Sequence, residues 1–237
     1  MGNTVRTVLT AGTAGSEKLS FGSNGRGAGG DELTTVTVKC PLPGWKKAWT
    51  PLHSAAAAGD LDGITRELEK GISVDVSADF MTPLHISAVM GEEDAARLLL
   101  RSGADLTAKT FEGKTSPELA ALCHHPELAR LLTVFTTARQ LTDGGKTVTV
   151  SLDGGRRTDL TAELKRIASG RRDEHRHDGS VFGNYERKLP AQNRYYYTEF
   201  VHRTNPNTPG PRRVVIGMKG DVWYTPDHYN TFFRVAP

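Results

Sequence analysis

The stretch Thr82-Pro-Leu-His-Ile-Ser87 repeats an earlier one, Thr50-Pro-Leu-His-Ser-Ala55, at a distance of 32 residues, and a weaker copy, Thr115-Ser-Pro-Glu-Leu-Ala120, follows after 33 more. Threonine is a good helix N-cap and proline suits the first turn, so each copy is expected to start a helix at the same place. A period of this length indicates stacked helix pairs, in which each repeat buries its apolar face only against its neighbours.

A second helix is predicted in each repeat, over residues 61–70, 92–101 and 126–139. In the middle one, residues 95–100 supply an apolar face, and Gly103 permits a left-handed cap that ends the helix. Each repeat is therefore predicted to form two helices joined by a short turn.

The spacing and the Thr-Pro-Leu-His motif resemble ankyrin repeats, and about three of them are predicted over residues 49–139. The resemblance implies an all-α solenoid that binds a protein partner, of unknown identity, through its hairpin loops and concave helix face. It implies no catalytic residues. In this motif the repeated histidines, here His53 and His85, are more often structural than functional, with each imidazole bonding backbone between repeats.

The last 80 residues carry a spaced set of a carboxylate, an imidazole and a guanidinium side chain. Cleaving RNA through its own 2'-hydroxyl requires a base, an acid for the leaving 5'-oxygen and a cation for the phosphate. Glu199, His228 and Arg213 supply one of each. Any one of them alone is more often an ordinary surface residue, so the prediction depends on the whole set.

From about residue 160 to residue 235, the chain resembles the guanyl-specific microbial ribonucleases, the family of barnase. The segments that carry this resemblance are Ile167-Ala-Ser169, Asp178-Gly-Ser-Val-Phe182, Asn184-Tyr-Glu186, Leu189-Pro190, Tyr196-Tyr-Thr-Glu199, Arg212-Arg-Val-Val-Ile216 and Asp227-His-Tyr-Asn-Thr-Phe232. Their order is that of the family, and their spacings require only small gaps.

The resemblance implies that Glu199 is the general base, His228 the general acid and Arg213 a phosphate ligand, with a 2',3'-cyclic phosphate product and neither metal nor other cofactor. It also implies a carboxylate, Glu186, that accepts from the N1 and N2 donors that guanine alone presents. The substrate-binding residues expected in all are Phe182, Asn184, Tyr185, Glu186, Arg212 and Tyr229.

One departure from the family concerns the phosphate. Many members carry a second arginine four residues before the position of Arg213, where this chain has Pro209. Losing one charge-assisted donor commonly costs on the order of 10²-fold in rate, unless Arg212 or Arg203 reaches in. An alternative function therefore stays open, in which an ankyrin adaptor carries a ribonuclease-like domain that binds RNA but cleaves it weakly or not at all.

The expected fold is multidomain, an all-α ankyrin solenoid followed by a small α+β ribonuclease domain with one helix, residues 159–168, on an antiparallel sheet. The candidate strands are residues 195–202, 213–217, 221–225 and 231–235. The expected boundaries are a mostly disordered, glycine-rich segment 1–48, repeats 49–139, a linker 140–157 and the ribonuclease-like domain 158–237. Residues 33–39 and 146–152, in the first segment and the linker, alternate like strands, and residues 153–155 are expected to form a turn.

Composition bears on the partners and the site of action. Residues 158–237 hold 13 Lys and Arg against 9 Asp and Glu, a modestly basic balance that suits an RNA substrate. No apolar run approaches a membrane span and no secretory signal is evident, so a cytoplasmic site of action is expected, with export without a cleaved signal left open. An endoribonuclease toxin or effector is therefore expected, and the family resemblance implies a small, acidic, barstar-like inhibitor.

Two histidine pairs invite comparison with metal sites. They are His124-His125 and His175-Arg-His177. Neither has a cysteine or a further histidine cluster to complete a ligand set, so solvated positions are expected for both.

Overall fold

The computed structural model describes residues 7–10, 16–21, 35–39, 49–203, 205 and 210–235. The described helices are α1 (Pro51–Ala58), α2 (Leu61–Glu69), α3 (Pro83–Met90), α4 (Glu93–Arg101), α5 (Ser116–Leu122), α6 (Pro126–Thr142) and α7 (Thr161–Ala168). The strands after the helical array (α1–α6) are β4 (Thr149–Ser151), β5 (Arg157–Asp159), β6 (Ser180–Val181), β7 (Tyr197–Val201), β8 (Arg213–Gly217), β9 (Val222–Thr225) and β10 (Phe233–Arg234).

The first helix of each repeat starts as the repeated motif predicts. Thr82 precedes α3 in an extended conformation and Pro83 occupies the first turn. The N–H of Thr82 donates to Nδ1 of His85 (3.0 Å), and Nε2 of the same ring lies 3.0 Å from the carbonyl oxygen of Ala108. Burial lowers the pKa of His85. The motif histidine is therefore a neutral structural group that caps its own helix and bonds the next repeat.

After the array come the β4–β5 hairpin, helix α7 and a five-stranded antiparallel sheet of order β10-β9-β8-β7-β6. Glu199 of β7 pairs with Val215, which pairs in turn with Trp223. Because side chains alternate along a strand and directly opposed residues share a side, these three residues lie on one face of the sheet. We call it the site face, and the opposite face, which carries Phe200 and Val214, the helix face.

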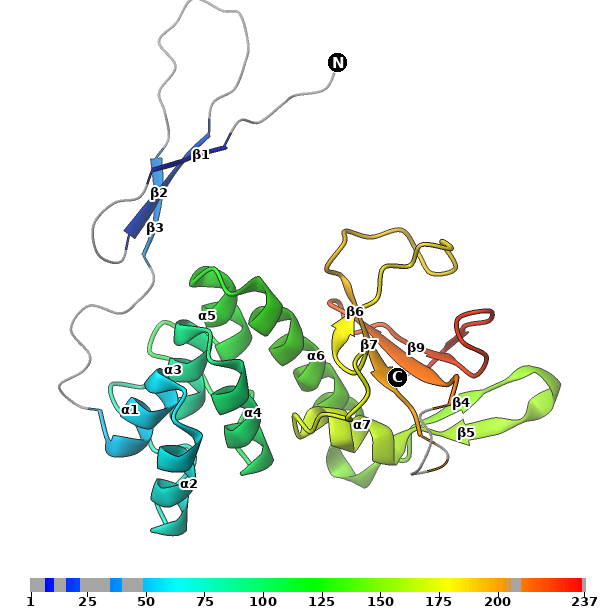
Figure 1. The fold of residues 1–237 in the computed structure, drawn as a ribbon, viewed down its shortest axis with the longest axis horizontal. Coiled ribbons are helices and arrows are strands. Elements are labelled where there is room, and N and C mark those ends of the chain that lie inside the picture. Colours follow the sequence, from blue (N-terminus) through cyan, green and yellow to red (C-terminus); the bar gives the residue numbers. More distant parts are fainter. Residues whose placement is uncertain are drawn as a thin grey trace, which may run out of the picture.

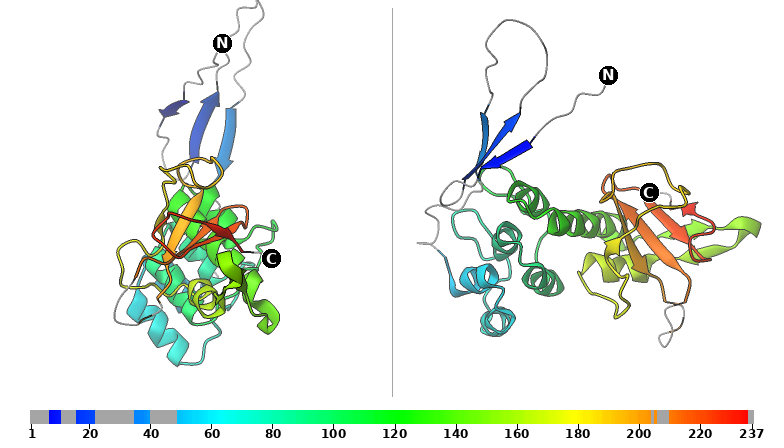
Figure 2. Two further views of the ribbon diagram at one scale, coloured as in Figure 1. Left: turned by 90° about the vertical axis from the view of Figure 1, so that its right-hand side faces the viewer. Right: turned by 45° about the horizontal axis from the view of Figure 1, so that its top comes forward.

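The helix face packs against α6 and α7 (Figure 1). Phe200 and Val214 belong to a buried cluster that continues through Leu164 of α7 and Phe135 of α6 into the earlier helices. Figure 2 shows α6 running from the array to the sheet. The array and the sheet therefore share one hydrophobic core, and the expected architecture of ankyrin helices followed by a helix on an antiparallel sheet is confirmed.

The segment expected as a linker, residues 140–157, contains ordered elements. Helix α6 extends to Thr142, and β4 pairs with β5 through Val150 and Thr158. Val150 is buried in the shared core. The alternation of threonine and valine before an Asp-Gly-Gly turn explains the hairpin, because one face of a short strand pair can pack while the other stays in water.

The segment expected to be mostly disordered, residues 1–48, contains strands β1 (Thr7–Thr10), β2 (Ser16–Phe21) and β3 (Thr35–Lys39). They form an antiparallel sheet in that order. The rest of the segment lies outside the described residues. Among the helices that the structure describes, none has the length and apolar character needed to cross a membrane.

Candidate active site

Glu199 lies at the middle of β7 with its carboxylate on the site face. It is 5% exposed. Its Oε1 accepts from the hydroxyl of Ser180 (3.1 Å), and its Oε2 accepts from the hydroxyl of Tyr229. Its backbone oxygen accepts from the N–H of Gly179 (2.8 Å). A buried carboxylate that accepts few hydrogen bonds keeps lone pairs for another proton donor, which a general base requires.

Arg213 lies at the start of β8 on the same face as Glu199. It pairs with Val201, two residues beyond Glu199 in β7, so the alternation of side chains places both charged groups on the site face. Arg213 is 3% exposed, and its Nη1 donates to the backbone oxygens of Gly210 and Arg212, both at 2.8 Å. Its Nε has no partner among the described residues. A buried guanidinium with unused donor capacity suits an anionic oxygen.

The loop after β9 presents His228 and Tyr229. Both residues have positive φ, 56° and 73°, a region that non-glycine residues seldom occupy. The N–H of His228 donates to the oxygen of Pro211 (3.1 Å), and that of Tyr229 donates to the hydroxyl of Thr225 (2.9 Å). Asp227 closes the loop by accepting from the N–H of Thr231 (2.9 Å). Several hydrogen bonds thus hold two residues in an unfavourable backbone conformation, which is typical of functional loops.

Tyr229 connects the loop to the base. Its hydroxyl donates to Glu199, and its ring centroid lies 4.7 Å from that of His228. Burial raises the pKa of Tyr229, and the hydrogen bond to the Glu199 carboxylate raises it further. The tyrosine therefore keeps its proton and holds one oxygen of the carboxylate. His228 itself is exposed at the edge of the site.

The loop after β6 carries the residues expected to recognise guanine. Phe182 is buried, and its ring centroid lies 5.2 Å from that of Tyr229. The side-chain amide of Asn184 donates to the oxygen of Leu189 (2.9 Å) and accepts from its N–H (3.0 Å). Asn184 therefore closes the loop on itself. Glu186 lies exposed within that closed loop, where a ligand can reach its carboxylate.

Tyr185 is 88% exposed at the tip of this loop. Its ring lies so close to Gly183 that a Cβ added there would come within 2.4 Å of it. The ring of Tyr185 thus covers Gly183 and keeps its outer surface open to solvent.

Arg212, expected to bind substrate, lies on the other side of the sheet. It is one residue away from Arg213 in an extended segment, so the two side chains point in opposite directions. Burial lowers the pKa of His202 and raises that of Tyr224, and the charge of Arg212 acts on both of these helix-face residues. The structure therefore does not bring Arg212 together with Glu199.

Arg203, the other candidate for a second phosphate cation, is engaged elsewhere. Its Nη2 donates to Asp173 at 2.7 Å. Neither Arg203 nor Arg212 therefore takes the place of the second arginine that the family resemblance implied. Pro209, which occupies that position in the sequence, lies outside the described residues.

His177 approaches the candidate base, although the sequence indicated only a solvated position. Its Nδ1 lies 3.6 Å from Oε1 of Glu199, and its side chain is 43% exposed. Its neighbour Asp178 explains the approach, because that carboxylate accepts from the N–H of Val201 (3.0 Å) and from both Nη atoms of Arg166 (2.9 and 2.7 Å). In the sequence, the signal for the position of His177 was the Asp178-Gly-Ser motif that follows it, because the hydrogen bond of Asp178 to Val201 holds this segment beside β7.

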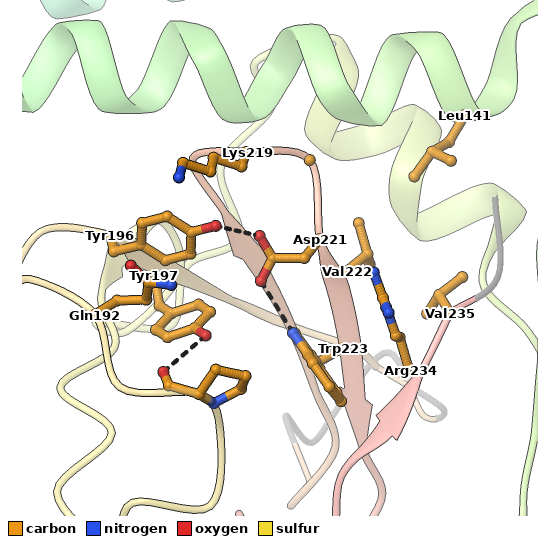
Figure 3. A pocket seen from close by; sticks show the side chains of 12 residues that line it. Leu141, Gln192, Tyr196, Tyr197, Lys219, Asp221, Val222, Trp223, Arg234 and Val235 are labelled. Carbon is orange, nitrogen blue, oxygen red and sulfur yellow. Dashed lines mark hydrogen bonds between the residues drawn. The ribbon is translucent and has the colours of Figure 1, made fainter.

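A separate cavity of about 430 Å³ opens at the end of the sheet where β8 turns into β9, lined by Trp223 of the site face and by Val222 of the helix face (Figure 3). The hydroxyl of Tyr196 and Nε1 of Trp223 both donate to Asp221, at 2.6 and 3.1 Å. Burial raises the pKa of Tyr196 to about 12. These bonds fix the two aromatic rings. Glu199, Arg213 and His228 do not line this cavity.

Two parts of the chain match known families. Residues 146–236 match the family described as ribonuclease, and residues 31–110 match ankyrin repeats. The chain is 43% identical over 56 residues to guanyl-specific ribonuclease St of Saccharopolyspora erythraea. This alignment covers 23% of this chain and 55% of that protein. It is 33% identical over 81 residues to the transient receptor potential cation channel subfamily A member 1 homolog of Caenorhabditis elegans, covering 34% of this chain and 7% of that protein.

Solved ribonuclease structures also resemble part of the chain in sequence. One is the structure of ribonuclease Sa2 with guanosine-2'-cyclophosphate. The aligned region is 38% identical in sequence, covers 33% of this chain and 85% of the ribonuclease Sa2 chain, and gives a TM-score of 0.31. The chain spans about half of ribonuclease St and a small fraction of the channel homolog. Ankyrin repeats therefore precede a ribonuclease-family domain related to the guanyl-specific ribonucleases.

Proposed function

Because the C-terminal part is a ribonuclease-family domain, we propose that the chain is an endoribonuclease that cleaves single-stranded RNA on the 3' side of guanosine. The observation that supports this most directly is the shared site face, where Glu199 and Arg213 are both buried and Tyr229 bonds the carboxylate. Burying polar and charged groups is costly unless they act on one another or on a ligand. A folding role alone would be served better by apolar side chains.

In the proposed reaction, Glu199 takes the proton of the 2'-hydroxyl and that oxygen attacks the adjacent phosphorus. The bond from phosphorus to the 5'-oxygen of the next nucleotide breaks as His228 gives that oxygen a proton. The products are a 2',3'-cyclic phosphate and a free 5'-hydroxyl. Arg213 stabilises the negative charge that develops on the phosphate oxygens.

Guanine selectivity is proposed for the loop after β6. Its exposed carboxylate, Glu186, can accept from N1 and N2 of guanine, and adenine offers no such pair of donors. The neighbouring rings of Phe182 and Tyr229 offer apolar surface beside an unstacked base. Asn184 supports recognition by holding the loop closed.

We also propose a toxin or effector role, in which the ankyrin repeats dock on a protein and the cell that makes the chain keeps an acidic, barstar-like inhibitor. Such an inhibitor would be attracted by the excess of Lys and Arg in the C-terminal part. Expression of the parent chain should slow growth of a host cell, and Glu199→Gln should relieve that effect. Equal growth with both chains would contradict the toxin role.

The reaction is tested with a short RNA that contains one guanosine, by identifying the 2',3'-cyclic phosphate end. Glu199→Ala and His228→Ala should each lower kcat by about 10²–10⁴-fold, the range of general acid–base catalysis. Glu112→Ala, an exposed carboxylate between two array helices, should leave kcat unchanged. An uncut RNA with folded parent protein across a range of pH would contradict the enzyme, and RNA binding that survives Glu199→Gln would then favour the adaptor.

A further inference from the structure

We propose that Arg130, from the last array helix α6, is a positioning residue for Glu199, so that the ribonuclease site is complete only when the array is in place. The proposal rests on the function proposed above. It concerns a contact made by a helix that lies in neither matched part of the chain, since α6 follows the ankyrin match, which ends at residue 110, and precedes the ribonuclease match, which begins at residue 146.

Arg130 reaches the back of the catalytic strand from the helix face. It is 4% exposed, and its Nη1 donates to the hydroxyl of Thr198 (2.5 Å), the residue before Glu199. Its Nη2 donates to the carbonyl oxygen of Gly179 (3.3 Å). The N–H of Gly179 in turn donates to the backbone oxygen of Glu199 (2.8 Å). One guanidinium therefore joins the two backbone segments that hold the candidate base.

Arg130 does more than fill space in the hydrophobic core. Leu131, Leu132 and Phe135 of the same helix already fill the shared core. Burial lowers the pKa of Arg130, its nearest carboxylate is the half-exposed Glu127 (3.4 Å), and its Nε has no partner among the described residues. A leucine or methionine would avoid that desolvation. The arginine instead supplies directed hydrogen bonds to β7 and to the turn before β6.

The array contains a matched control. Arg97 of α4 is also 4% exposed, and its Nη1 donates to the backbone oxygen of Gly170, beyond α7 (3.0 Å). It also bonds Glu93 (2.8 Å) and lies over the ring of Phe135. Arg97 thus joins the array to the ribonuclease domain as Arg130 does. Its hydrogen bonds go to Gly170 and Glu93, so it lies beside Gly179 without the bond that Arg130 makes there.

The test compares Arg130→Met and Arg97→Met in the full chain, with kcat and KM measured on the RNA containing one guanosine. Displacing a catalytic group by a fraction of an ångström to 1 Å can cost about 10–100-fold in rate, so Arg130→Met should lower kcat by that factor with KM within about twofold. Arg97→Met should lose similar thermal stability and keep the parent kcat. Arg130→Lys, which retains one charged donor, should recover part of the rate.

Two outcomes would overturn the proposal: a folded Arg130→Met chain with the parent kcat, or a fall in kcat that is equal in both methionine variants and follows their loss of stability. If the parent cleaves no RNA, the proposed function fails, and positioning is judged by NMR of the Glu199 carboxyl and the Gly179 amide. A change confined to Arg130→Met supports positioning, and unchanged signals contradict it.

Discussion

The two faces of the sheet differ sharply although they are built from the same strands. On the helix face, Phe200 and Val214 are buried among apolar side chains from α6 and α7. On the site face, Glu199 and Arg213 are buried to a similar degree but have polar or charged side chains. Burial on the first face stabilises the fold, whereas burial on the second face removes from water the charged groups that we propose act on RNA. Burial alone therefore does not distinguish the apolar core from the candidate site.

The largest effect is expected for Glu199→Gln. The amide keeps the shape of the carboxylate but cannot take a proton, so kcat should fall by about 10²–10⁴-fold with little loss of stability. RNA cleavage and thermal unfolding of the same preparation measure both quantities. If the variant is less stable but each folded molecule keeps the parent rate, Glu199 on the site face would be a structural residue and not a catalytic one.

The next largest effect is expected for the neighbouring residue on the helix face. Phe200→Ala removes a ring that is 1% exposed, and such changes cost about 3–5 kcal/mol of unfolding free energy. Urea unfolding should show this loss. At a temperature where the variant is folded, its kcat should stay within a few-fold of the parent. Stability close to that of the parent would show that the shared core tolerates a cavity.

A smaller effect is expected for Asn184→Ala. The change removes two hydrogen bonds that close the loop after β6, each of which contributes about 0.5–1.5 kcal/mol. KM for guanosine-containing RNA should rise by about tenfold as the loop loses its order. Tyr185→Ala, at the exposed tip of the same loop, serves as the control and should raise KM less. The reverse order would identify Tyr185 as the main base contact.

The smallest effect concerns pH. Burial lowers the folded-state pKa of His53 and His85 below the usual value of 6.5. The unfolded chain therefore binds a proton first as the pH falls, and stability should decrease once the pH passes below about 6.5. Urea unfolding at pH 7.5 and pH 5.5 measures the decrease. His85→Gln should make stability less dependent on pH over this interval, and an unchanged dependence would point to other groups.

Local patterns were sufficient for much of the fold. The threonine and proline of each repeat predicted the start of α1, α3 and α5, and the strands expected at residues 195–202, 213–217 and 221–225 correspond to β7, β8 and β9. These signals work because capping and strand alternation depend on residues close together in the chain. Helix α6 is the exception, since it continues to Thr142 within a segment interpreted as a linker.

The candidate site was less predictable, because several of its contacts depend on strand pairing. Adjacent arginines cannot be told apart by type, yet Arg213 lies on the site face and Arg212 on the helix face. His177 gave no periodic signal, and its approach to Glu199 follows from the bonds of Asp178 to β7 and α7. A shift of one residue in register would exchange the two faces entirely.

The sequence by itself determined the helix-pair repeats and the antiparallel strands and indicated the candidate acid, base and cation, because these follow from motifs that span few residues. Only the tertiary structure decided which face each charged group occupies and that Arg130 of α6 bonds Thr198 behind Glu199. The physical reason is distance along the chain. Arg130 and Thr198 are separated by 68 residues, and no local preference specifies a contact that requires the array and the sheet to share one core.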